Sequence, residues 1–122
     1  MYQIFEDMTF HEIVDFTIDK YIREYGSVKF NKLYETIMTA NKLSGLLSKS
    51  KFQRATLDSS VVLSYICETP YFIFKSNWTQ VVGAVLFLYR WDQEVNSELG
   101  LFSQEQLKLH AVSCYEQYRI FG

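Results

Sequence analysis

The side chains of this sequence best suited to binding a metal or to catalysis are two histidines and two cysteines. His11, Cys67, His110 and Cys114 each stand alone in a helical pattern and do not form the paired, short-spaced motifs of zinc sites. The chain also lacks a glycine-rich phosphate loop, a nucleophile motif and paired carboxylates in an apolar setting. We therefore expect no enzyme, no metal and no cofactor, with packing or surface roles for these four residues.

Positive charge is concentrated in residues 27–56, although the whole chain has a formal net charge of −2. This segment contains one acid, Glu35, and its bases are Lys29, Lys32, Lys42, Lys49, Lys51 and Arg54. Such a charge run is commonly a solvated face, and the alternative is a patch that faces a ligand. The negative mean charge argues against a protein that coats nucleic acid, which needs a concentrated cationic surface.

The composition indicates one all-helical domain over residues 1–122. The chain is 48% hydrophobic and 17% aromatic with 5 Gly and 1 Pro, which is too apolar for disorder and too poor in turn residues for many short strands. Its two cysteines lie far apart, and its start lacks the pattern of a secretion signal. We expect an intracellular, cytoplasmic protein with reduced thiols.

Local signals predict about six helices, one of them doubtful. The first follows Thr9, which has the capping-box spacing to Glu12, and it stops at Gly26 in a left-handed conformation. A second spans about 30–42, and a third spans about 59–68 before Pro70. The stretch 46–57 between them is a weak helix or an irregular connection. The last helix follows Ser103, which has the same spacing to Gln106.

The helix expected at about 77–92, capped by Ser76, has no polar side. Its apolar run of nine residues, 81–89, is well short of the ~20 that a membrane-spanning helix needs. A helix that is apolar all round is stable in water only when other helices surround it. We expect this segment to be the central helix of a bundle.

Two of these helices together resemble the B-cell-lymphoma-two (Bcl) family of apoptosis regulators, in particular its small viral members. The first helix matches the family's fourth homology region with apolar pairs, a tyrosine and a glycine, at Ile13, Val14, Ile18, Tyr21, Ile22 and Gly26. The central helix matches the first homology region at Asn77, Trp78, Val81, Val82 and Gly83. Thr79 and Gln80 depart from it, because the family has Gly and Arg at these positions.

The resemblance implies a Bcl-like bundle and a survival factor that inhibits apoptosis. Such a protein sequesters the amphipathic death-segment helix of pro-apoptotic host proteins in a hydrophobic groove. The implied groove residues are Tyr34, Met38, Leu46, Leu47, Phe52, Val61, Val62, Tyr65, Asn77, Trp78, Gln80, Val81 and Val85. Lys49, Lys51 and Arg54 would steer an acidic partner helix. No apolar tail follows the last helix, so we expect no membrane anchor in this chain and recruitment to mitochondria through partners.

Several alternatives stay open at this point. Trp78 fits a groove wall or a core plug, and Gln80 either satisfies nearby backbone or faces the groove. A chain that ends at the sixth helix would leave apolar surface bare, which favours a homodimer over a repacked monomer. The basic stretch 42–54 also suits a small helical regulator that binds nucleic acid, and a purely structural helical oligomer is a third class.

Overall fold

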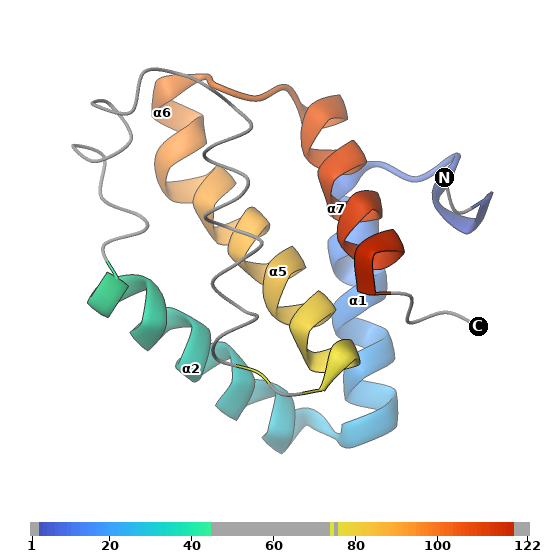
Figure 1. Ribbon diagram of the computed structural model, residues 1–122, viewed down its shortest axis with the longest axis vertical. Coiled ribbons are helices and arrows are strands. Elements are labelled where there is room, and N and C mark those ends of the chain that lie inside the picture. Colours follow the sequence, from blue (N-terminus) through green and yellow to red (C-terminus); the bar gives the residue numbers. More distant parts are fainter. Residues whose placement is uncertain (1–2, 45–73, 75, 119–122) are drawn as a thin grey trace.

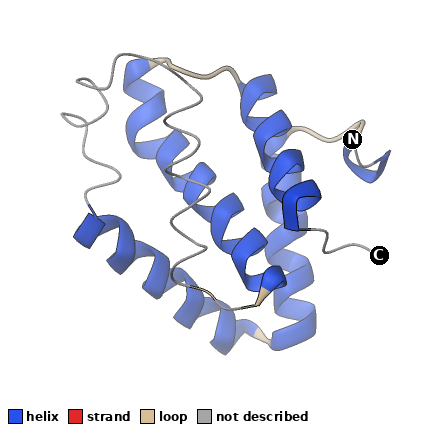
Figure 2. Cartoon of the chain, in the orientation of Figure 1, coloured by secondary structure: helices blue, strands red, loops and turns tan. Residues whose placement is uncertain are grey.

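The computed structural model describes residues 3–44, 74 and 76–118, and all regular structure in these ranges is helical (Figures 1 and 2). A short 3-10 helix, η1 (Gln3–Phe5), precedes α1 (Phe10–Tyr25) and α2 (Ser27–Ser44). After the gap come α5 (Asn77–Trp91), the π-helical η2 (Asp92–Asn96), α6 (Ser97–Leu99) and α7 (Gln104–Tyr118). The predicted all-helical class is confirmed for these residues.

The central helix of the bundle is α5, as its apolar sequence predicts. Every residue from Gln80 to Leu88 is buried, and α1, α2 and α7 pack around α5 (Figure 1). Ser76 caps the helix as predicted, because its Oγ accepts a hydrogen bond from the Thr79 N–H at 3.2 Å. Figure 1 also shows that α1 and α7 run in the same direction while α5 runs against them, so the first turns of α1 and α7 lie at the same end.

Both predicted capping boxes are present. At α1, the Thr9 N–H donates to Glu12 Oε1 and the Glu12 N–H donates to Thr9 Oγ1, each at 3.2 Å. At α7, the Ser103 N–H donates to Gln106 Oε1 at 2.8 Å and the Gln106 N–H donates to Ser103 Oγ at 3.1 Å. Reciprocal bonds of this kind satisfy N–H groups that a helix start leaves without acceptors.

The second helix begins at Ser27, earlier than the predicted start near residue 30. Gly26 ends α1 as predicted and has a positive φ of 91°, but its ψ of 158° is extended, so the expected left-handed helical conformation is not adopted. Its N–H donates to Ile22 O at 2.7 Å, and its own carbonyl accepts from the Phe30 N–H at 3.2 Å. The same residue therefore ends one helix and begins the next, so no separate connection is needed.

The chain stays helical beyond the predicted end of the central helix near Asp92. The Ser97 N–H donates to Asp92 O, five residues earlier, which is the π-helical pattern, and Gly100 then stops the helix with a φ of 63°. Helical structure thus reaches Leu99. None of the helices in the described ranges is long and apolar enough to cross a bilayer.

The structure adds one core element that the sequence patterns did not indicate. Phe5, in η1, is fully buried, with its ring centroid 5.7 Å from that of Phe16 and 4.7 Å from that of Tyr115. Tyr115 and Thr17 also form a buried hydrogen bond between α7 and α1. The segment before α1 is therefore fixed to the bundle by side chains from both α1 and α7.

Candidate functional site

The structure describes only part of the predicted groove. Leu46, Leu47, Phe52, Val61, Val62, Tyr65, Lys49, Lys51 and Arg54 lie outside the described residues, as do the predicted helix at 59–68 and the stretch 46–57. Met38 lies on α2, but its side chain is also outside them. Tyr34, on the same helix, is half-buried, and its ring centroid lies 6.2 Å from that of Phe30.

Four of the predicted groove residues on α5 differ strongly in exposure. Asn77, the first residue of the helix, is exposed, whereas Val81 and Val85 are fully buried in the core. Trp78 is 8% exposed, its ring lies 6.2 Å from that of Tyr115, and Lys20 Nζ lies 5.3 Å from its centroid. These contacts place Trp78 in the core between α5, α1 and α7.

Gln80 makes the backbone contact, which is one of the two roles its sequence position allows. The residue is 6% exposed, and its Nε2 donates to the Phe74 carbonyl at 2.8 Å. That bond matches a buried carbonyl in the segment leading into α5, where an unmatched acceptor would be costly. The Gln80 amide is thus engaged within the chain, at the position where the Bcl family has arginine.

The histidines and the described cysteine occupy separate packing positions. His11 is exposed, with its ring 6.0 Å from that of Tyr89, and His110 is half-buried, 5.8 Å from Phe102. Burial lowers the pKa of His110 because the charged form loses solvation. Cys114 is buried, and in the described part of the chain no three His, Cys, Asp or Glu residues gather as metal ligands would.

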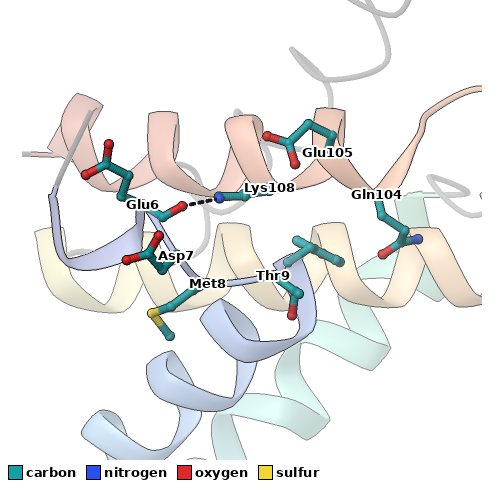
Figure 3. Close-up of a pocket in the computed structure, with 8 residues that line it drawn as sticks. Glu6, Asp7, Met8, Thr9, Gln104, Glu105 and Lys108 are labelled. Carbon is teal, nitrogen blue, oxygen red and sulfur yellow. Dashed lines mark hydrogen bonds between the residues drawn. The ribbon is translucent and has the colours of Figure 1, made fainter.

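A cavity of about 270 Å³ lies between the segment leading into α1 and the first turn of α7 (Figure 3). It is lined by Glu6, Asp7, Met8, Thr9, Phe10, Gln104, Glu105 and Lys108. A larger, separate hollow of about 470 Å³ lies along α1, where the described lining residues are Phe16, Lys20, Arg23 and Glu24. Neither was predicted from the sequence.

Lys108 is the unusual member of the smaller cavity. It is 9% exposed, and its Nζ donates to the backbone carbonyl of Glu6 at 2.8 Å (Figure 3). The burial of Lys108 could have been predicted from the sequence. Lys108 has helical spacing to Ala111, Val112 and Tyr115, which are buried on the same face of α7. A lysine on an otherwise apolar stripe marks a buried charge.

A second set of buried polar groups lies where η2 leads through α6 to α7. The Asn96 Nδ2 donates to Asp92 Oδ1 at 2.8 Å and to Phe102 O at 3.0 Å, and the Phe102 N–H donates to Asn96 Oδ1 at 2.7 Å. Gln104 Nε2 approaches both Asp92 carboxylate oxygens at 3.4 and 3.5 Å. One asparagine therefore closes the turn and helps to solvate a buried carboxylate.

Comparison with known protein families, with characterised proteins and with solved structures finds no match.

Proposed function

We propose that this chain is a survival-type regulator of apoptosis that binds the amphipathic death-segment helix of pro-apoptotic proteins. The observation that carries the proposal is α5, an all-round apolar helix buried among α1, α2 and α7. Its Asn77-Trp78 start and the pattern of α1 are the features that resemble the Bcl family. The expected groove lies beside α2 and α5, where the partner helix would bury its apolar face.

The engagement of Gln80 defines how the partner would be held. Members of the family use arginine there to pair with an aspartate of the incoming helix, whereas the Gln80 amide donates to Phe74 O. Binding would then depend on the apolar anchors of the partner, through burial of apolar area at about 25 cal/mol per Å². Lys49, Lys51 and Arg54 would contribute mainly to the rate of association.

Calorimetric titration against a panel of death-segment peptides tests the proposal. Each peptide is paired with a control in which its apolar anchors are replaced by glutamate. We expect at least one peptide to bind one-to-one with a Kd near or below about 1 µM, and its control not to bind. Absence of binding to every peptide, or equal binding of the controls, would contradict the proposal.

Two matched changes locate the contact. Tyr34→Ser on α2 should weaken binding, whereas Tyr25→Ser, at an exposed tyrosine next to the α1–α2 junction, should leave it unchanged. Replacing the peptide's aspartate by alanine should change Kd by less than about threefold, because Gln80 offers it no cation; a well-formed ion pair would cost tenfold or more, about 1.5–3 kcal/mol. Thermal unfolding of both variants checks that the fold is intact.

A further inference from the structure

The ammonium group of Lys108, a largely buried residue, has unused hydrogen-bonding capacity in the described chain. An ammonium has three N–H donors, and in the described chain Lys108 Nζ has one acceptor, the Glu6 carbonyl. The side chain is 9% exposed, and no described carboxylate forms an ion pair with it. A cation that has no described counter-charge within ion-pair distance and is partly shielded from water would attract an anionic group placed beside it.

The cavity next to Lys108 is where such a group has room. It measures about 270 Å³, and its lining includes Phe10 and Gln104, the first residues of α1 and α7. The N–H groups at these positions have no acceptor within their own helices, and helix starts carry partial positive charge. Lys108 and the two helix starts are therefore the features of the cavity lining that favour a carboxylate.

The cavity lining also carries negative charge. Glu6, Asp7 and Glu105 also line it, and all three side chains are exposed. These carboxylates would repel a multiply charged anion such as phosphate, and they would attract a cationic group on the ligand. A ligand with a carboxylate at one end and an ammonium a few bonds away is complementary to both signs of charge in the lining.

We propose that this cavity binds a small zwitterion of the free α-amino acid class. The ligand's carboxylate would accept hydrogen bonds from Lys108 Nζ, and its ammonium would lie among Glu6, Asp7 and Glu105. The site is separate from the proposed groove on α2 and α5, so its test does not depend on peptide binding.

Amide NMR titration of the full chain with L-alanine tests this site. Shifts should saturate at the amides of Phe10, Gln104 and Glu105. Acetate, which lacks the ammonium, and alaninamide, which lacks the carboxylate, should each bind at least about tenfold more weakly. Lys108→Met should abolish the alanine shifts, whereas Lys29→Met, at an exposed lysine on α2, should not.

Asp7→Asn provides a second variant, and we expect its fold to stay intact because Asp7 is exposed. It should weaken alanine binding and leave acetate binding equal or stronger, because it removes only negative charge. No saturable shifts with alanine, or equal alanine binding by folded Lys108→Met, would overturn the proposal. Binding of phosphate or acetate as tightly as alanine would also overturn it, because Glu6, Asp7 and Glu105 would then not favour a ligand that carries an ammonium group.

Discussion

Two groups of buried polar side chains lie on either side of the first turn of α7, and their hydrogen bonding differs. On one side, Asn96 uses both ends of its amide on Asp92 and on the Phe102 backbone. On the other, the described chain occupies one of the three donors of Lys108, through Glu6 O. Gln104 contacts the first group and lines the cavity of the second. The hydrogen bonds of Asn96 fix the path of the backbone into α7. The Lys108 ammonium has two N–H donors without a described acceptor, and a ligand could accept hydrogen bonds from them.

The largest expected effect on stability comes from changing Asn96, whose hydrogen bonds are all within the fold. Asn96→Ala removes three hydrogen bonds and leaves the buried Asp92 carboxylate and both Phe102 backbone groups short of partners. We expect the free energy of unfolding to fall by about 3 kcal/mol, measured by urea denaturation. Ser97→Ala is the control, because its exposed hydroxyl has a single hydrogen bond among the residues that the structure describes, to Gln93 O. A loss for Asn96→Ala no larger than that of the control would refute a structural role for the group.

Gln80 also has its amide hydrogen-bonded within the chain, and changing it to arginine should reduce the unfolding free energy by somewhat less than Asn96→Ala. Gln80→Arg would lose the bond to Phe74 O and place a guanidinium in a site that is 6% exposed. We expect a loss of about 2 kcal/mol in unfolding free energy, without tighter binding of death-segment peptides. Stronger peptide binding by a fully stable variant would mean that the position faces the groove.

For Lys108→Met we expect almost no change in the free energy of unfolding. Lys108→Met keeps most of the buried stem and removes a charge with one hydrogen bond, so its unfolding free energy should stay within about 1 kcal/mol of the wild type, on either side. Lys108→Ala, which also removes the stem, should be less stable than Lys108→Met. A loss above about 2 kcal/mol for Lys108→Met would show that the ammonium itself holds the fold.

The smallest effect concerns the pH dependence of stability through His110. Burial lowers the pKa of this histidine in the folded state, so between that pKa and the unfolded value of about 6.5 the unfolded chain binds more protons. Stability should therefore decrease as the pH falls below about 6.5 and show no contribution from His110 above it. His110→Gln should reduce the difference in denaturation midpoint between pH 7.5 and pH 5.5; an unchanged difference would exclude this group as a source.

The features that sequence patterns predicted correctly depend on neighbours within a few residues. The capping boxes at Thr9 and Ser103 and the cap at Ser76 each involve partners three residues apart, and all are present. The burial of α5 follows from its composition alone, because an all-round apolar helix must be enclosed.

The features that were missed depend on contacts outside the three- and four-residue spacings on which helical patterns are based. Phe5 is buried because Tyr115 lies beside it, and Lys108 bonds to Glu6 across 102 positions. Helical structure continues past Asp92 into η2, where Asn96 bonds to the backbone of Phe102. Sequence spacing also left two roles for the Gln80 side chain, a backbone contact or a position facing the groove, because its acceptor, Phe74 O, lies outside the helix. A lysine on the buried stripe of α7 was visible in the sequence, but its acceptor was not.

Amide hydrogen exchange of the chain with and without a saturating death-segment peptide tests the proposed receptor role most directly. Slower exchange is predicted in α2 around Tyr34 and at the exposed start of α5 near Asn77, with the first turns of α1 and α7 unchanged. Unchanged exchange throughout α2, or slowing confined to the cavity beside Lys108, would contradict a groove on α2 and α5.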